Sequence, residues 1–217
     1  MTPAMTPAQM PSPPRAHYHH GDLRAAMIRA AGQLIAELGP DAVSVREVAR
    51  RAGVSSGAPF HHFPTRQALM AAVAEEATHQ LRRCIEEAIA GIPTTKPAKR
   101  VRAAARAWLR WVVDSPDQFK VMSGQRLIDH TEPAQRDNEA IQAILREALR
   151  QAIRNDGKRA VEIDQAMLEM QAMAYGLARM YVDGHLARPG MTRADTLERM
   201  VAAQDDLVAR LMGKKAA

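Results

Sequence analysis

The chain has 217 residues, a formal net charge of +6, and 47% hydrophobic but only 4% aromatic residues. This composition excludes a wholly disordered chain, because such chains lack the apolar residues needed to bury a core. The length allows one or two domains, and abundant Ala, Leu, Met, Arg, Glu and Gln favour helix over sheet.

Cysteine usage and hydrophobic runs narrow the class further. A single cysteine, Cys84, excludes an intrachain disulfide and a metal cage built from several cysteines. The sequence pI of about 9.9 permits an acidic partner such as nucleic acid. No apolar run reaches the roughly 18 residues of a membrane span, and the N-terminus lacks the pattern of a signal peptide. We therefore expect a cytoplasmic protein that does not contact a membrane.

Residues 1–20 are predicted to form a disordered arm. They contain five prolines and almost no bulky apolar residue, so they cannot bury a core of their own. The true start of translation could also be Met5 or Met10.

The first helix is predicted over residues 23–38. Apolar residues recur there at steps of three and four, which places them on one helix face; they are Leu23, Met27, Ala30, Ala31, Leu34, Ile35 and Leu38. Asp22 is expected to cap its start, and Gly39 is expected to end it.

Two short helices separated by a glycine turn come next. Residues 44–47 (Ser-Val-Arg-Glu) read as a capping box that opens the first of them, and Gly53 ends it. Ser55 is expected to cap the second, which runs to about His62. Pro59 disfavours a helix that starts so early, because its ring meets the carbonyl four residues back, and it indicates a later start or a tighter first turn. This is the helix–turn–helix pattern.

The remaining chain also shows helical periodicity and no strand pattern. The predicted helices cover residues 65–90, 98–114, 115–122, 141–153, 163–186 and 192–212. The helix over 163–186 carries two adjoining apolar stripes and is therefore expected to be buried on more than one side. The predicted fold is all-α with about nine helices.

The segment from Leu23 to Leu69 resembles the DNA-binding headpiece of the TetR family of transcriptional regulators. The residues that carry the resemblance are Leu23-Arg24, Gly39, Ser44-Val45-Arg46-Glu47-Val48-Ala49, Ala52-Gly53-Val54-Ser55, Phe60, His62-Phe63-Pro64 and Arg66 to Leu69. The resemblance implies a helix–turn–helix DNA-binding domain over 21–66. It also implies a helical domain over 67–217 that binds a ligand and dimerises.

The candidate DNA contacts follow from the resemblance and from groove geometry. A helix fits the major groove, and the start of the preceding helix meets phosphates. The expected DNA-binding residues are Ser44, Arg46, Ser55, Ser56, Gly57, Ala58, Phe60, His61, His62 and Arg66. The family often has Tyr at the position of Phe60, which cannot donate a hydroxyl bond and is interpreted as a packing residue. Arg66 stands where Lys is usual and keeps the charge.

Other basic residues leave two interpretations open. Arg50 and Arg51 either form a solvated helix face or contact DNA. The arm from Arg15 to His20 either stays disordered or reaches an adjacent groove. The basic cluster between Lys96 and Arg110 resembles a nucleic-acid patch, but a solvated helix face explains most of it.

The resemblance further implies a homodimer through the last two helices, a palindromic double-stranded DNA operator, and a small-molecule effector. The candidate ligand-binding residues are Trp108, Trp111, Phe119, Met122, Met167, Met170, Met173 and Tyr175, with Gln171, Arg179 and His185 as polar candidates. Methionine suits adaptable apolar surfaces, and ordinary core packing is the alternative for each of them.

The favoured interpretation is a ligand-responsive repressor without catalytic residues, metal or cofactor. The sequence contains no nucleophile elbow, no glycine-rich phosphate loop and no paired-histidine metal helix. The alternatives are a DNA-binding helical protein without small-molecule control and a helical interaction protein that has lost DNA binding.

Overall fold

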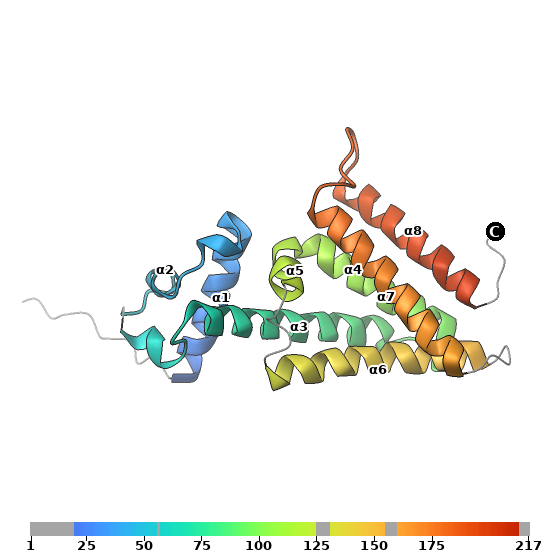
Figure 1. Ribbon diagram of the computed structural model, residues 1–217, viewed down its shortest axis with the longest axis horizontal. Coiled ribbons are helices and arrows are strands. Elements are labelled where there is room, and N and C mark those ends of the chain that lie inside the picture. The colour runs from blue at the N-terminus through green and yellow to red at the C-terminus, as the bar shows by residue number, and fades with distance from the viewer. Residues whose placement is uncertain (1–19, 56, 125–130, 155–159, 213–217) are drawn as a thin grey trace, which may run out of the picture.

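The protein is all-helical in the computed structural model, which describes residues 20–55, 57–124, 131–154 and 160–212 (Figure 1). These residues contain no strand. The α-helices are α1 (His20–Leu38), α2 (Val45–Arg51), α3 (Arg66–Ala90), α4 (Pro97–Asp114), α5 (Pro116–Ser123), α6 (Glu132–Arg154), α7 (Ala160–Val182) and α8 (Arg193–Leu211). Two 3-10 helices, η1 (Pro40–Ala42) and η2 (Ala58–His61), complete the described fold.

The predicted fold class is confirmed, with one difference in the helix count. The segment expected to be a third α-helix of the helix–turn–helix is the 3-10 helix η2, so eight α-helices are described where about nine were expected. The predicted disordered arm falls almost entirely outside the described residues. No described helix combines the length and the apolar character needed to cross a membrane.

The long helix α3 runs through the molecule and contributes to two separate cores (Figure 1). Its first half, from Leu69 to Ala74, packs with α1 and α2 in one core. Its second half, from Ala77 to Ile89, packs with α4, α5 and α6 in another. The predicted domain boundary between residues 66 and 67 lies in the first turn of this continuous helix and remains a prediction.

Helix α5 is shared between the same two cores. Val121 is buried in the core formed with α1 and α2, whereas Phe119 and Met122 are buried in the core formed with α4 and α6. A displacement of this short helix would therefore disturb the packing of both cores.

Several predicted helix ends are confirmed. Gly39 follows α1 with a φ of 84°, a conformation that favours glycine. Thr65 caps α3, because its Oγ1 accepts a hydrogen bond from the Ala68 N–H at 3.0 Å. Thr192 and Asp195 form a full capping box at the start of α8.

Two predicted caps are wrong, and the predicted cap at Ser44 is confirmed without the full capping box. Asp22 lies inside α1, which begins two residues earlier at His20. Ser55 caps no helix, because η2 begins at Ala58 after Gly57 and thereby keeps Pro59 in its first turn, where its ring meets no carbonyl. At Ser44 only half of the capping box forms: Ser44 Oγ accepts from the Glu47 N–H at 3.2 Å, but the Glu47 carboxylate accepts from Arg50 instead.

Helix α6 begins at Glu132, well before the predicted start at residue 141. Its first turns carry polar residues that interrupt the apolar pattern, among them the buried Asp137. Asp137 accepts a hydrogen bond from Arg82 Nη1 at 2.9 Å and is 3.2 Å from His79 Nδ1, both on α3. This ion pair joins the first turns of α6 to α3.

Replacing the cap of α3 should destabilise the protein measurably. Thr65→Ala removes the hydrogen bond to the Ala68 N–H and is expected to lower the free energy of unfolding by about 1 kcal/mol in denaturant titrations. The matched control is Thr94→Ala in the exposed loop between α3 and α4, expected to change it by less than about 0.5 kcal/mol. Equal effects of the two substitutions would contradict the capping role.

Candidate nucleic-acid interface and cavity

Helix α2 presents one buried and one exposed face. Val45, Val48 and Ala49 are buried in the core formed with α1 and α3, and this packing fixes the rotation of the helix. The opposite face exposes Arg46 and Arg50. Side chains at the start of α2 are therefore held in position while remaining free to reach a partner.

The connection from α2 to η2 is a tight turn. Gly53 adopts a φ of 69°, and the Val54 N–H donates to the Ala49 carbonyl at 3.1 Å. Beyond the turn, Pro59 and Phe63 are buried and hold η2 against the core, and the Arg24 guanidinium lies 5.8 Å from the centre of the Phe63 ring. Phe60 points outward and is 41% exposed.

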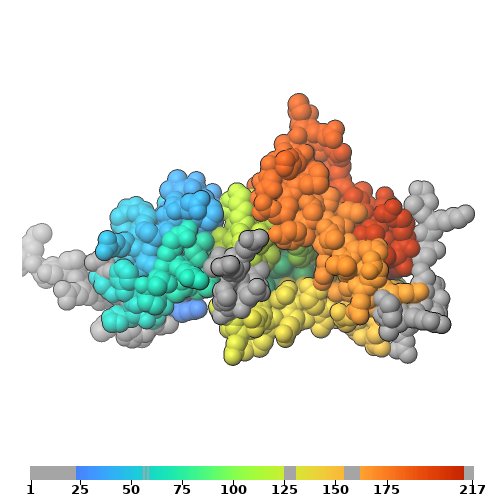
Figure 2. All heavy atoms as spheres, viewed as in Figure 1, coloured from blue at the N-terminus to red at the C-terminus, as the bar shows by residue number. Residues whose placement is uncertain are grey.

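These elements lie at one end of an elongated molecule (Figure 2). Helices α1 and α2, with η2 and the start of α3, form that end, and α4, α6, α7 and α8 form the other (Figure 1). The exposed side chains of α2 and η2 are thereby separated from the larger helical body.

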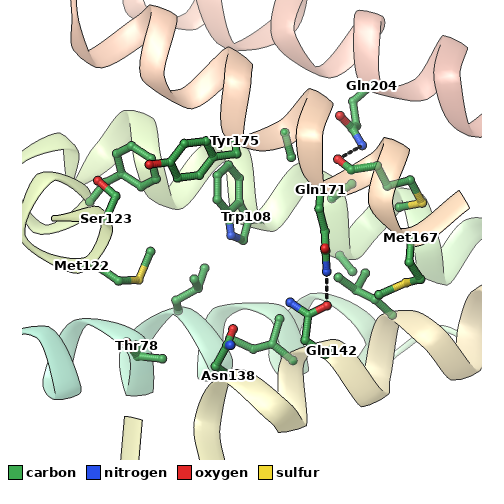
Figure 3. Close-up of a pocket in the computed structure, with 18 residues that line it drawn as sticks. Thr78, Trp108, Met122, Ser123, Asn138, Gln142, Met167, Gln171, Tyr175 and Gln204 are labelled. Atoms are coloured by element: carbon green, nitrogen blue, oxygen red, sulfur yellow. Dashed lines mark hydrogen bonds between the residues drawn. The ribbon is translucent and has the colours of Figure 1, made fainter. Parts of the chain in front are cut away.

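A cavity of about 260 Å³ lies within that body, with walls from α3, α4, α5, α6 and α7 and with Gln204 from α8 (Figure 3). Its lining is mainly apolar and includes Leu81, Ile141 and Leu145. Cavities of this kind, with a few polar groups in an apolar wall, are the usual form of small-molecule sites.

Three aromatic rings form one end of the cavity. The Trp108 and Phe119 rings meet edge to face, with centroids 5.8 Å apart and an interplanar angle of 83°. The Phe119 and Tyr175 centroids are 5.7 Å apart at 56°. Such tilted contacts are the favourable arrangement for aromatic pairs. Figure 3 shows Trp108 and Tyr175 beside one another at this end, near Ser123.

The chain matches two family models that together cover well over half of it. Residues 27–73 match the model described as bacterial regulatory proteins, tetR family, and residues 101–204 match the tetracyclin repressor-like C-terminal domain. The chain belongs to the TetR family. The first match covers the helix–turn–helix, and the second covers all of the residues that line the cavity except Thr78 and Leu81 of α3.

Individual relatives agree with the family. The HTH-type transcriptional repressor Rv3405c of Mycobacterium tuberculosis is 38% identical over 89 residues, which is 41% of this chain and 47% of the relative. The HTH-type transcriptional regulator BetI of Escherichia coli is 27% identical over 126 residues, 49% of this chain and 65% of the relative. The chain thus spans only about half to two thirds of the length of these relatives.

Solved structures show the same fold. A protein of unknown function from Rhodococcus sp. RHA1 has a TM-score of 0.73 and 26% identity, with 90% of this chain and 98% of that chain covered. The TetR family regulator PfmR from Thermus thermophilus has a TM-score of 0.63 and 20% identity, with coverage of 88% and 99%.

Most of the predicted DNA-binding residues of this TetR-family protein are gathered at the headpiece end. The exposed members are Ser44, Arg46, Ser55, Gly57, Phe60, His61 and Arg66, and His62 is half-buried. Ser56 and the side chain of Ala58 lie outside the described part of the structure. Phe60, expected to pack, is instead substantially exposed, because Pro59 and Phe63 fill the core beneath η2.

Arg66 has partners within the headpiece itself. Its Nε donates to the Val43 carbonyl at 2.9 Å, and its Nη2 donates to the Pro40 carbonyl at 2.8 Å. It thereby ties the start of α3 to the connection between α1 and α2. No sequence pattern indicated this role, since the two carbonyls are distant in the chain; the predicted phosphate contact remains a prediction.

The neighbouring arginines of α2 are also paired. Arg50 donates to both carboxylate oxygens of Glu47, and these hydrogen bonds lower the pKa of Glu47 and raise that of Arg50. Arg51 forms an ion pair with Glu37 of α1. Arg46, in contrast, is exposed and forms no ion pair within the described residues.

The basic cluster of α4 serves the packing of the helical body. Arg106 donates to Glu198 at 2.8 Å, and Arg102 lies 3.7 Å from Asp205, so both join α4 to α8. Arg100 donates to the carbonyls of Ile89 and Ile92 at the end of α3. These contacts favour the interpretation as a helix face over that as a nucleic-acid patch.

Six of the eight predicted ligand-binding residues and one of the three polar candidates line the cavity. Those that line it are Trp108, Phe119, Met122, Met167, Met170, Tyr175 and the polar candidate Gln171. Trp111 instead borders an open groove between α3 and α4, and Met173 packs against a core cluster formed by α4, α6, α7 and α8. The polar candidates Arg179 and His185 are not among the lining residues, and Arg179 is paired with Asp183.

Sequence reasoning found Gln171 but missed the other polar lining residues, which are Thr78, Ser123, Asn138, Gln142 and Gln204. Gln204 was detectable, because it interrupts the apolar stripe of α8 between Met200 and Leu207. Gln142 of α6 and Gln171 of α7 form a hydrogen bond with each other across the cavity (Figure 3). Within the described residues, no cluster of His, Cys, Asp or Glu could hold a metal ion.

The Glu47–Arg50 pair gives a pH prediction. Because the folded-state pKa of Glu47 is lowered, the pair stabilises the headpiece above the unfolded-state pKa, and this stabilisation is lost as pH falls through the folded-state value. In Arg50→Gln, the Glu47 carboxyl is expected to titrate at a higher pH, measured by carbon-13 NMR. Arg83→Gln on α3 is the control. An unchanged Glu47 titration in Arg50→Gln would contradict the pairing.

Proposed function

We propose that this TetR-family protein is a sequence-specific DNA-binding transcriptional regulator, acting in the cytoplasm as a homodimeric repressor under the control of a small molecule. The observation that carries the proposal is the headpiece, where a buried face of α2 and the buried Pro59 and Phe63 hold outward-facing polar residues at one end of the molecule. The repressor role is supported by the relative Rv3405c, whose name describes it as a repressor.

The DNA contact would be made by α2 and η2. A helix–turn–helix places its second element in the major groove and the start of the preceding helix near phosphates. Here Ser55, Gly57 and His61 are exposed around the second element, and Arg46 near the start of α2 has no ion-pair partner in the described chain. Small residues around η2 would let its backbone approach the base edges closely.

Selection from random DNA with the full-length protein, at low salt and without added compound, tests the DNA contact. Recovery of a palindromic sequence is expected, since two copies related by a twofold axis contact two half-sites. Arg46→Ala should weaken binding to the recovered sequence and reduce the salt dependence of log affinity by about one unit of slope.

The matched control for Arg46→Ala is Arg83→Ala, which removes the same charge from an exposed position on α3 in the body. It should leave the salt slope unchanged. Equal losses in the two variants would show that net charge, and not the headpiece, drives binding. Failure to recover any palindrome would count against the proposed function as a whole.

Control by a small molecule is supported by the position of α5. Phe119, Met122 and Ser123 line the cavity, while Val121 of the same helix is buried against the headpiece core. A molecule that pushed α5 would shift the headpiece through this contact. An effector acts by binding one conformation of the protein better than another. For such control, α5 need only occupy different positions in the two conformations, because it contacts both the cavity and the headpiece.

Dimerisation is proposed through α7 and α8. Helix α7 exposes several large apolar side chains in the single chain, including Leu168 at 60% and Met180 at 43%. It forms much of the surface seen in Figure 2. Exposed apolar side chains gathered on one helix mark a contact with another protein. In a twofold-symmetric dimer, the α7 surface of one subunit would be covered by the α7 surface of the other.

Leu168→Glu should weaken the dimer, because it places an unpaired charge in the contact. Sedimentation velocity is expected to show a dimer dissociation constant raised at least roughly tenfold. Leu38→Glu is the control, since Leu38 is 66% exposed on α1 at the headpiece end. A dimer that tolerates Leu168→Glu as well as Leu38→Glu would contradict an interface on α7.

A further inference from the structure

The cavity wall carries no charge within the described part of the chain. Its polar side chains are Thr78, Ser123, Asn138, Gln142, Gln171 and Gln204, all of them neutral, and its other residues are apolar or aromatic. A charged ligand buried in such a wall would lose its hydration without gaining an ion partner, which is costly. The wall therefore selects for an uncharged occupant.

Gln204 is the most informative of these polar groups. It is 1% exposed, and its Nε2 donates to the Met170 carbonyl at 3.3 Å. That bond sets the orientation of the amide, because the reverse orientation would bring two carbonyl oxygens together. The Oε1 atom is then left buried without a hydrogen-bond partner among the described residues. A buried unpaired acceptor is destabilising, and an N–H or O–H group of a ligand would satisfy it.

The opposite end of the cavity offers a second unpaired group. The Ser123 Oγ is also buried without a partner in the described part of the chain. Figure 3 places Ser123 beside Tyr175 at one end and Gln204 above Met167 at the other. A hydroxyl can donate or accept, so the Ser123 end tolerates either kind of polar group. Only the Gln204 end requires a donor.

The size and shape of the wall limit the occupant further. The volume of about 260 Å³ falls just below the roughly 300–1,000 Å³ usual for ligand pockets. The rings of Trp108, Phe119 and Tyr175 stand tilted to one another at one end, an arrangement that accepts another flat ring in an edge-to-face or offset contact.

We propose that the effector is a compact, uncharged, mainly apolar molecule with an aromatic ring at the Trp108 end. It donates an O–H or N–H hydrogen bond to Gln204 Oε1. This inference rests on the proposed function in one respect, that the cavity is the effector site. The chemistry of the wall, and not any known effector, defines the class.

Three matched probes test the class with the full-length protein and without DNA. The probes are 4-phenylphenol, which has one neutral O–H donor, 4-methoxybiphenyl, which has none, and biphenyl-4-carboxylate, which is charged at pH 7. Quenching of tryptophan fluorescence, to which Trp108 in the cavity wall and Trp111 outside it both contribute, and calorimetry report binding. We expect the phenol to bind roughly three- to tenfold more tightly than the methoxy compound, the effect of one hydrogen bond. The carboxylate should bind at least about 100-fold more weakly than the phenol.

Two glutamine variants locate the donor contact. Gln204→Leu keeps the bulk but removes the acceptor, so the preference for the phenol over the methoxy compound should disappear. Gln118→Leu is the control, because the Oε1 of Gln118 is also buried and unpaired within the described residues but does not line the cavity. This variant should keep the preference. Each comparison is a ratio of two affinities in one protein, so a change in overall stability does not mimic it.

The outcomes separate this inference from the proposed function. Binding of none of the probes, equal binding of the phenol and the methoxy compound, tight binding of the carboxylate, or a preference that survives in Gln204→Leu would each overturn the proposed class. DNA selection is a separate measurement. Palindrome recovery together with any of these results would leave the regulator intact and reject only the effector chemistry.

Discussion

The burial of α3 in two cores is the constraint on which the structure depends. A helix of 25 residues cannot bend freely, so the direction in which Leu69 and Val73 pack with α1 and α2 also sets where Ala77, Leu81 and Ile85 meet α4, α5 and α6. The Arg82–Asp137 pair adds a polar contact to α6. The headpiece and the body are therefore joined by one stiff element, with α5 as a second contact between them.

The cavity lies beside these two shared helices, α3 and α5. It opens where α6 and α7 face α4 and α5, and neutral amides and hydroxyls provide its polar atoms. Charges nearby are used elsewhere: Arg102 and Arg106 join α4 to α8, and Arg82 faces Asp137. Because the charged side chains pair outside the cavity, the cavity next to α5 is lined by uncharged residues. Helix α5 thus contacts both the cavity and the headpiece core.

The arginines of the headpiece differ in whether another group of the protein already pairs with them. Arg50, Arg51 and Arg66 have protein partners, whereas Arg46 has none within the described residues. The net charge of +6 does not distinguish among them. What matters for a phosphate is which guanidinium is exposed and uncommitted, because an arginine already bonded to a carboxylate must give up that bond to reach DNA.

The sequence by itself determined the helical class, the order of the helices and the turn at Gly53, because these depend on apolar spacing, capping residues and glycine conformation over a few neighbouring positions. It also placed Trp108, Phe119 and Met170 at a common cavity. The later start or tighter turn at Pro59 was also predictable from the sequence. Only the tertiary structure decided that α6 extends back to Glu132 with Asp137 paired to Arg82, and that Arg66 bonds to the Val43 and Pro40 carbonyls. It also turned Trp111 away from the cavity and left Gln204 Oε1 unpaired among the described residues. These features depend on partners far away in the chain, and local periodicity carries no information about them.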